Sequence, residues 1–488
     1  MKRKRFALAL LAAVLAAGTA LAYLPPSPVQ NLLHAASGPA DLRARLVAHA
    51  DSASANALDA GEAWYFAGSS WARAGKPDSA LAAFRRAWSL RANPEDALAM
   101  VDVMLAKGSP AYADSARELL EPVMAEHAAA GGPVIDEMRL RDAWLRAVRG
   151  DAAGVRTALA PRTGLLVRPR TEIPNRALWA GRFAPLALQL SNDDTAWRLI
   201  SPIVVATRGH DPYTSRLARE AATGRPFAGT YEQWLAQACA EADSAETAPL
   251  KPWRVRALAV RAEDGAALHA WLAPGPAGAA FAVLAAPPES RALLESDSLL
   301  VQLRRSGLTV VVLEPRGVRR SASAANPSSV MWIGHEEAVQ RRLARDLGHA
   351  LTAAARATGV AAPRALAVGT GPTSLAAVLA CGADTRYRAV LLAGPDIAPV
   401  DRGWLRASLA RSGAPVFFET GPEDVTGNEA VDRIVAALPA KQSRVADAQS
   451  PGRGAALFRA GPAEGARVAA WLKDALKPRP ATPPAPPR

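Results

Sequence analysis

Residues 364–381 read RALAVGTGPTSLAAVLAC, and this stretch decides how the second half of the chain is interpreted. The apolar run Ala365–Val368 predicts a buried strand, and the following Gly369-Thr370-Gly371 predicts a turn bounded by glycines. A helical pattern opens at Pro372, with apolar residues recurring three and four positions apart. We therefore expect a strand, a sharp turn and a helix in direct succession.

Length and composition predict a folded protein of two or three domains. The chain has 488 residues, of which 50% are hydrophobic and 21% are charged, so a packed core is expected and wholesale disorder is excluded. The formal net charge of +13 comes from basic residues spread along the chain, without the clustered basic patch and interleaved aromatics of a nucleic-acid binder. We expect no nucleic-acid partner, and the milder consequence of the charge is weak attraction to anionic surfaces.

The N-terminus carries a targeting pattern. Residues 2–5 are basic, residues 6–17 are apolar, and Ala20-Leu21-Ala22 offers a cleavage site between small residues. Residues 1–24 are therefore predicted to be a signal peptide or, if uncut, a membrane anchor through residues 6–24. Both interpretations place the bulk of the chain outside the cytoplasm, as a periplasmic, extracellular or membrane-anchored protein.

The chain has two cysteines, Cys239 and Cys381. In an oxidising compartment they could form one disulfide. The alternative, which we favour, is that Cys381 is a buried thiol on the helix that follows the turn.

Two segments of different composition precede the second half of the chain. Residues 25–40 mix proline, serine and glycine and are predicted to form a linker. Residues 41–250 follow a helical pattern and are predicted to form an all-α domain.

Residues 61–94 within this helical domain resemble a tetratricopeptide repeat. The residues that carry the resemblance are Trp64, Gly68 and Trp71 on a first predicted helix and Ala80, Phe84 and Ala87 on a second, after a break at Gly75–Asp78. Trp71 stands where the family has tyrosine. The resemblance implies paired helices that approach closely at the small residues, and it implies a protein partner.

Two further hairpins are predicted, at residues 94–127 with a break at 107–110, and at residues 136–161 with a turn at Gly150-Asp151. About three such units together would bury one another's apolar faces. The alternative is an irregular helical domain with one fortuitous motif.

From Trp253 onward, predicted strands alternate with predicted helices. An opening hairpin spans Arg254–Ala262 and Ala266–Ala273, turning at residues 263–265. Further strands are expected at residues 280–285, 308–313, 387–392 and 415–419 and around Val445, and helices at residues 291–306, 336–358, 429–438 and 463–476. This alternation predicts a mostly parallel sheet covered on both faces, within a domain over residues 251–476. The proline-rich residues 477–488 predict a disordered tail.

Three motifs in residues 252–476 resemble the α/β-hydrolase family, with the bacterial acetyl-esterase and dienelactone-hydrolase group the most similar. Residues 364–381 resemble its nucleophile elbow, G-x-S-x-G, with Gly371 at the position of the nucleophile. Residues 313–321 are similar to the D-x-R-G-x-G-x-S turn after the fourth strand, with Glu314 replacing the aspartate and Arg319 the second glycine. Residues 421–424 are similar to the G-x-x-D segment, which places the triad acid at Asp424.

The resemblance implies a serine nucleophile, a histidine base and an orienting acid, and the sequence departs from it at several places. Gly371 carries no hydroxyl. Pro372 has no N–H group, although the residue after the nucleophile normally donates one to the oxyanion hole. All seven histidines lie at or before His349, so none follows Asp424, and the expected base position falls near Ala455.

The second oxyanion donor normally comes from the loop after the third strand. Here this loop reads Ala285-Ala286-Pro287-Pro288, without the usual glycines and with two residues that lack an N–H group. Removing one such donor costs roughly 3 kcal/mol of transition-state stabilisation.

Other residues are weak substitutes for the missing groups. Thr373 and Ser374 lie just past the turn, and we expect their hydroxyls to satisfy backbone donors at the start of the helix. His335 precedes a long predicted helix and could in principle reach the site, but a histidine at a helix start is the plainer interpretation. No cluster of histidine, cysteine or acidic residues has metal-ligand spacing, and no phosphate-binding loop carries its lysine, so we expect neither metal nor cofactor.

These observations argue against catalysis while they predict a hydrolase-like fold. Our first hypothesis is an exported or membrane-anchored protein in which a catalytically inactive α/β-hydrolase-like domain serves as a scaffold, or binds a small-molecule ligand above Gly371, and the helical repeats bind a protein partner. The alternative is an active serine-type ester hydrolase of the cell envelope with a non-standard nucleophile such as Ser374. A third hypothesis is an envelope-assembly adaptor in which the helical half carries the function.

Overall fold

The computed structural model describes most of the chain outside its N-terminus and residues 160–247. The described residues are 27–52, 56–107, 110–127, 133–149, 151–159, 248–286, 297–321, 334–422, 425–439, 441–447, 457–458 and 462–477. The predicted targeting segment, Cys239 and the C-terminal tail lie outside them. Within these ranges, no helix combines the length and the apolar character needed to cross a membrane.

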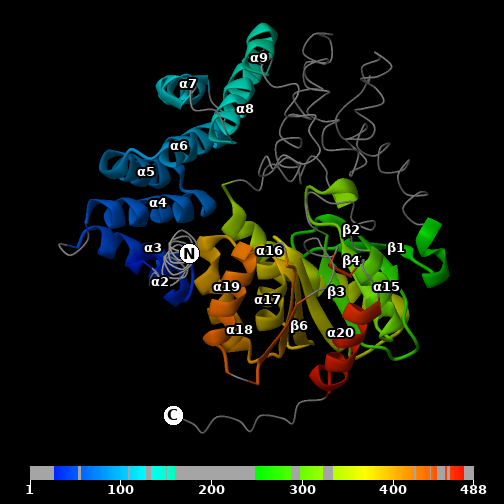
Figure 1. Cartoon of the computed structure of the whole chain (residues 1–488). Helices are drawn as coiled ribbons and strands as arrows, with labels where there is room; N and C mark the ends of the chain where they lie inside the picture. The colour runs from blue at the N-terminus through cyan, green and yellow to red at the C-terminus, as the bar shows by residue number, and fades with distance from the viewer. Residues whose placement is uncertain are drawn as a thin grey trace, which may run out of the picture.

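An eight-stranded sheet forms the centre of the C-terminal half (Figure 1). Across the sheet the strands are β1 (Arg256–Arg261), β2 (Ala267–Ala273), β4 (Thr309–Leu313), β3 (Phe281–Ala285), β5 (Ala365–Gly371), β6 (Tyr387–Pro395), β7 (Val416–Thr420) and β8 (Ser443–Asp447). Strand β2 is antiparallel to both of its neighbours, and all pairs from β4 to β8 are parallel. The predicted hairpin and mostly parallel sheet are confirmed.

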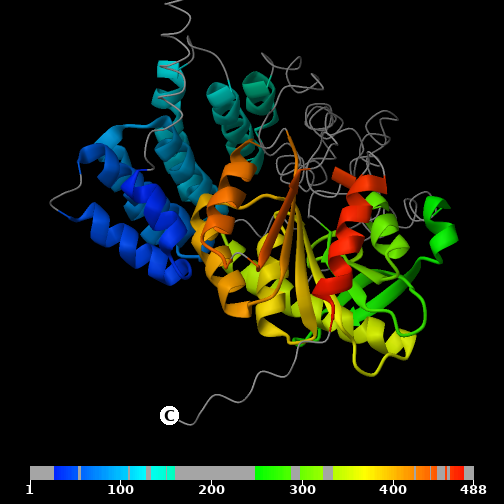
Figure 2. The ribbon, with the colours of Figure 1, turned by 60° about the horizontal axis from the view of Figure 1, so that its bottom comes forward.

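Helices cover both faces of this sheet (Figure 2). One face carries α16 (Glu336–Thr358), α17 (Ser374–Ala383), α18 (Arg402–Ser412) and α19 (Val425–Ala436), and the other carries α15 (Asp297–Arg305) and α20 (Pro462–Ala475). Alternate residues of β5 divide between the two cores: Ala365 and Ala367 face α16 and α17, whereas Leu366 and Val368 face α20. This three-layer arrangement fits an α/β-hydrolase-like domain.

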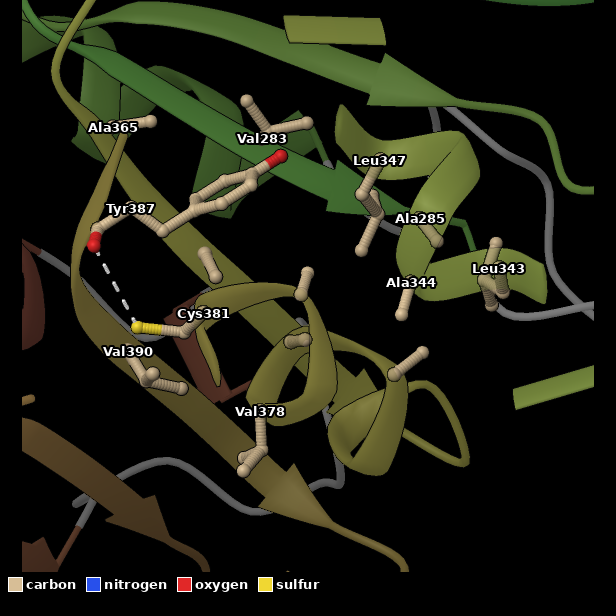
Figure 3. Packing of buried hydrophobic residues seen from close by; sticks show 14 of the residues in the cluster. Val283, Ala285, Leu343, Ala344, Leu347, Ala365, Val378, Cys381, Tyr387 and Val390 are labelled. Atoms are coloured by element: carbon tan, nitrogen blue, oxygen red, sulfur yellow. Dashed lines mark hydrogen bonds between the residues drawn. The ribbon is translucent and has the colours of Figure 1, made fainter. Parts of the chain in front are cut away.

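The first of these cores lies between the sheet and helices α16 and α17 (Figure 3). Tyr387 and Cys381 are both buried there, and Sγ of Cys381 lies 3.8 Å from the main-chain oxygen of Tyr387. Burial of the thiol agrees with the interpretation favoured from the sequence. Cys239, the other candidate for a disulfide, lies outside the described residues.

The helical half consists of helices that each pack against the next along the chain. They are α3 (Pro39–Ala50), α4 (Ala57–Arg73), α5 (Pro77–Arg91), α6 (Pro94–Lys107), α7 (Pro110–His127), α8 (Pro133–Val148) and α9 (Ala152–Leu159). Five of these begin at a proline, whose fixed φ suits a first helical residue and whose missing N–H would be unpaired there in any case. The three predicted hairpins correspond to α4–α5, α6–α7 and α8–α9.

The closest approach in the first hairpin occurs at Gly68 of α4. A Cβ atom on Gly68 would lie 2.8 Å from ring carbons of Phe84 on α5, so only glycine allows the two helices to meet there. Ala80 and Phe84 are buried in the same interface. The contact expected from the sequence is present, and the type of the repeat stays a prediction.

The linker predicted over residues 25–40 is wrong for most of its length, because helix α2 occupies residues 28–35 and α3 begins at Pro39. In α2 (Pro28–Ala35), the Ser27 hydroxyl caps the first turn by accepting from the Gln30 N–H, and Val29 and Leu33 are fully buried. Helix α2 packs on α18 at Gly403, where a Cβ atom would lie 2.7 Å from the Leu33 carbonyl oxygen. In so short a segment, the spacing of Val29 and Leu33 was too weak a pattern to predict this helix.

Two other differences concern the C-terminal half. Helix α18 and the short η5 (Pro399–Asp401) between β6 and β7 were not predicted. In addition, β5 continues to Gly371 instead of ending at Val368, so residues 369–371 belong to the strand and still pair with β6.

Candidate active-site elbow

The junction of β5 and α17 has the backbone geometry of a sharp strand-to-helix turn. Gly371 ends the strand with a φ of +51°, the left-handed region that glycine adopts most readily. The N–H of Thr373 then donates to the Thr370 carbonyl at 3.2 Å, and α17 begins at Ser374. The turn is therefore confined to residues 371–373, two residues later than the sequence predicted.

Gly369 allows α17 to lie directly against the strand. A Cβ atom at this position would come 2.5 Å from the Cα of Ser374, so a larger residue would force the helix away. At Gly371, by contrast, an added Cβ would meet no described atom within 4 Å. Packing against the described residues therefore does not require glycine at the nucleophile position, whereas the positive φ favours it.

The two hydroxyls beside the turn are bound to its main chain. Oγ1 of Thr373 accepts from the Thr370 N–H at 3.1 Å and lies 3.0 Å from the Thr370 carbonyl, to which it donates. The Ser374 hydroxyl donates to the Gly371 carbonyl at 2.7 Å. Both side chains are buried. We expected these hydroxyls to satisfy donors at the helix start, but both donate to carbonyl groups of the turn.

Pro372 connects the elbow to the neighbouring helix. Its carbonyl oxygen accepts from Nε2 of Gln340 on α16 at 3.0 Å. Its ring nitrogen has no hydrogen to donate, so the usual first donor of an oxyanion hole is missing from the turn. The second donor would come from the loop after β3, and the two prolines of that loop, Pro287 and Pro288, lie outside the described residues.

The structure does not bring a histidine to this turn from the candidates that it describes. The ring of His335 lies against Gly75 of the helical half: Nδ1 would be 2.8 Å from a Cβ atom on that glycine. His349 lies in the middle of α16, half-buried. Asp424 and Ala455, the predicted positions of the acid and the base, are outside the described residues. Over the described ranges, no three histidine, cysteine or acidic residues group as metal ligands.

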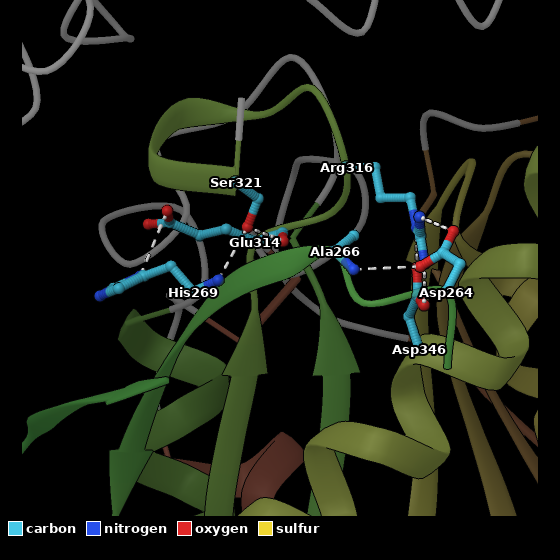
Figure 4. Close-up of polar contacts among 7 residues, drawn as sticks. All are labelled: Asp264, Ala266, His269, Glu314, Arg316, Ser321 and Asp346. Atoms are coloured by element: carbon cyan, nitrogen blue, oxygen red, sulfur yellow. Dashed lines mark hydrogen bonds and ion pairs between the residues drawn. The ribbon is translucent and has the colours of Figure 1, made fainter. Parts of the chain in front are cut away.

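A polar cluster that the sequence did not predict follows β4 (Figure 4). The fully buried carboxylate of Glu314 accepts from Nε1 of Trp271 at 3.0 Å and from the Arg320 N–H at 3.1 Å. Nδ1 of His269 lies 3.2 Å from Oε2 of Glu314. The hydroxyl of Ser321 donates to the Glu314 carbonyl and accepts from the His269 N–H. These contacts connect the turn after β4 to strand β2. They could not be predicted from the sequence, because they depend on the register between the two strands.

Arg316 in the same turn makes a second set of bonds. Its guanidinium donates to Asp264 at 2.6 Å and to Asp346 of α16 at 2.8 Å, joining the β1–β2 turn to that helix. These hydrogen bonds lower the pKa of Asp264 to about 2 and raise the pKa of Arg316. The turn that resembles D-x-R-G-x-G-x-S therefore carries structural contacts, with Glu314 in the place of the aspartate.

No family model matches the chain, and no curated protein matches it significantly. Among solved structures, the esterase Pf2001 of Pyrococcus furiosus is similar over 47% of this chain and 94% of its own, with 14% identity and a TM-score of 0.37. The esterase domain of a Rhodothermus marinus protein matches over 45% and 98%, with 17% identity and a TM-score of 0.33. A proposed dienelactone hydrolase of Klebsiella pneumoniae matches over 46% and 98%, with 16% identity and a TM-score of 0.34.

These similarities cover about half of the chain, and the strand order and pairing described above carry the assignment of an α/β-hydrolase-like domain. Chemically, the elbow as described offers buried hydroxyls that are already bonded to carbonyls and a proline where a donor would be needed. These hydrogen bonds stabilise the sharp turn between β5 and α17.

Proposed function

We propose that the chain is an exported or membrane-anchored protein whose α/β-hydrolase-like domain is catalytically inactive. In this role the domain is a scaffold or binds a small molecule above Gly371, and the tetratricopeptide-like helices bind a protein partner. The observation that carries the proposal is the elbow: glycine occupies the nucleophile position at a φ of +51°, and both neighbouring hydroxyls donate to main-chain carbonyls.

A hydroxyl bonded to a carbonyl is a poor nucleophile, because activation requires a base that accepts the hydroxyl proton. For Ser374, attack would also require breaking a 2.7 Å hydrogen bond and leaving the buried start of α17. The missing N–H of Pro372 would then leave the developing oxyanion without its usual first donor. Each of these costs acts separately, so restoring one group alone would not restore hydrolysis.

The test uses a fluorophosphonate probe together with turnover of a p-nitrophenyl ester, with an active serine esterase as the positive control. We expect no labelling and no turnover above background for the natural chain. Labelling at a single residue, lost together with turnover in Ser374→Ala, would establish the alternative of an active hydrolase with a non-standard nucleophile.

Gly371→Ser is the matched variant, because the described residues leave room for a side chain there. It restores the hydroxyl and neither the base nor the donor at Pro372, so we expect it to remain unlabelled. Export is tested separately by fractionation and N-terminal sequencing: a mature chain that starts just after Ala22 supports cleavage, and an intact N-terminus in the membrane fraction supports an anchor.

A further inference from the structure

The helical half meets the α/β-hydrolase-like domain at a junction of opposite charges. Nη1 of Arg43, on α3, lies 3.2 Å from Oε2 of Glu337 in the first turn of α16. Nη2 of Arg73, the last residue of α4, lies 2.5 Å from Oδ2 of Asp401 in η5. Each arginine thus pairs with its own carboxylate across the junction.

A third carboxylate, Glu336, has no arginine of its own. Its Oε2 atom is buried and has no hydrogen-bond partner among the described residues. Burial raises the pKa of Glu336, and the charge of Asp401 adds to this rise. The charge of Arg73 and hydrogen bonds from the main chain of Glu336 and Gly334 oppose the rise without cancelling it. Arg73 is already bonded to Asp401, whose pKa is also raised by burial against the opposing effect of Arg73.

Two further titratable groups near the junction lie on α16 and directly before it. Nη2 of Arg341 lies 3.4 Å from Oε1 of Glu337, so the carboxylate of Glu337 contacts two guanidinium groups, those of Arg43 and Arg341. The ring of His335 lies against Gly75, at the turn that follows α4. An ionised Glu336 would therefore place a negative charge on a carboxylate whose Oε2 atom is buried without a partner among the described residues and whose nearest arginine is already bonded to Asp401, which costs free energy unless the group stays protonated.

We propose that this junction is a proton-coupled clasp, in which docking of the helical half on α16 and η5 holds Glu336 as a neutral carboxylic acid. Ionisation of Glu336 as the pH rises then weakens the docking. The proposal is independent of whether the elbow is catalytic.

The direction of the pH dependence follows from linkage. The docked state binds the Glu336 proton more tightly than the separated state, so docking is favoured below the ordinary glutamate pKa. This contribution is lost as the pH rises through the raised pKa that Glu336 has in the docked state. The pKa of Asp401 is also raised, so its ionisation changes the stability of docking in the same direction. The junction therefore tightens on mild acidification and loosens in alkali.

The experiment compares Glu336→Gln with the natural full-length chain between about pH 5 and pH 8. Glutamine has the shape of the protonated acid and cannot ionise. At each pH we take the difference in thermal midpoint between the variant and the natural chain. We expect this difference to be larger at the higher pH than at the lower pH, in favour of the variant, by at least about 2 °C. Hydrogen exchange at each pH should show the first turn of α16 better protected in the variant only at the higher pH.

Glu337→Gln is the matched control, since it makes the same change one residue away at a carboxylate with two cations. We expect it to lower the midpoint at pH 8, opposite to Glu336→Gln. Asp401→Asn provides a second test if Glu336→Gln does not fold: it releases Arg73 to compensate Glu336, so the loss of stability with rising pH should shrink. A Glu336→Gln difference that is constant or decreases with pH, or an unchanged pH slope in Asp401→Asn, would overturn the proposal.

Discussion

Replacing Tyr387 by phenylalanine should stabilise the α/β-hydrolase-like domain. The side chain is 3% exposed, and its hydroxyl points toward Val283 in an apolar core (Figure 3). That hydroxyl has no hydrogen-bond partner within the part of the chain that the structure describes. Burial raises the pKa of the phenol well above its usual range, so the group is neutral and the cost is that of a lost hydrogen bond.

An unpaired buried hydroxyl costs about 1–3 kcal/mol, and removing the oxygen forfeits a few van der Waals contacts of roughly 0.1–0.2 kcal/mol each. The net gain expected for Tyr387→Phe is therefore about 1–2 kcal/mol. In a domain of this size each kcal/mol shifts the midpoint by roughly 2–4 °C.

Urea unfolding followed by circular dichroism measures this gain, with the thermal midpoint as a second readout. Tyr387→Leu is the control: it leaves a cavity where the ring was, and should destabilise the domain by about 2–4 kcal/mol. If Tyr387→Phe destabilises the protein by more than about 0.5 kcal/mol, the hydroxyl has a partner such as a buried water and the reasoning is wrong.

Two further predictions concern the helical half and its attachment. Gly68→Ala should destabilise the chain by about 1–3 kcal/mol, because the added methyl group overlaps the Phe84 ring. The control is Gly382→Ala in α17, where a Cβ atom meets no described atom within 4 Å; it should be neutral or stabilising by up to about 1 kcal/mol. Urea unfolding compares the two variants, and equal changes in the free energy of unfolding would refute the packing argument. Burial, followed by the charge of Arg402, lowers the pKa of His34 from 6.5 to about 4, so the neutral ring contributes stability above pH 6.5 that is lost as the pH falls toward 4. His34→Gln should remove about 1–2 kcal/mol of this acid sensitivity, allowing for the screening of a half-exposed group, and an unchanged pH profile of the unfolding midpoint would contradict it.

The layers of the C-terminal half could be predicted because each buried strand is a short apolar run separated from the next by a helical pattern. That Gly371 carries no hydroxyl and Pro372 no N–H group is likewise given by the residue types alone, whatever their surroundings. The helix boundaries around Gly68 followed from prolines and from the spacing of small and aromatic residues. All of these are local properties of the chain.

What could not be predicted depends on contacts between distant segments. The sequence allowed His335 to reach the elbow in principle but could not show that its ring lies against Gly75. The pairing of His269 with Glu314 likewise depends on the register of β2 beside β4. Helix α2 is too short and has too few apolar residues to be recognised from its own sequence. It is held in part by contacts with α18, which lies far away along the chain.

The seat of α2 on α18 also affects the order in which the chain folds. Nε of Arg406 donates to the His34 carbonyl at 2.9 Å across a sequence separation of 372 residues. During synthesis at about 5–20 residues per second, α2 would leave the ribosome roughly 20–75 s before the helix that receives it. The first helix of the described chain therefore completes its packing among the last, and until then Val29 and Leu33 lack part of their cover. The N-terminal end of the fold is thus finished only when almost the whole chain has been made.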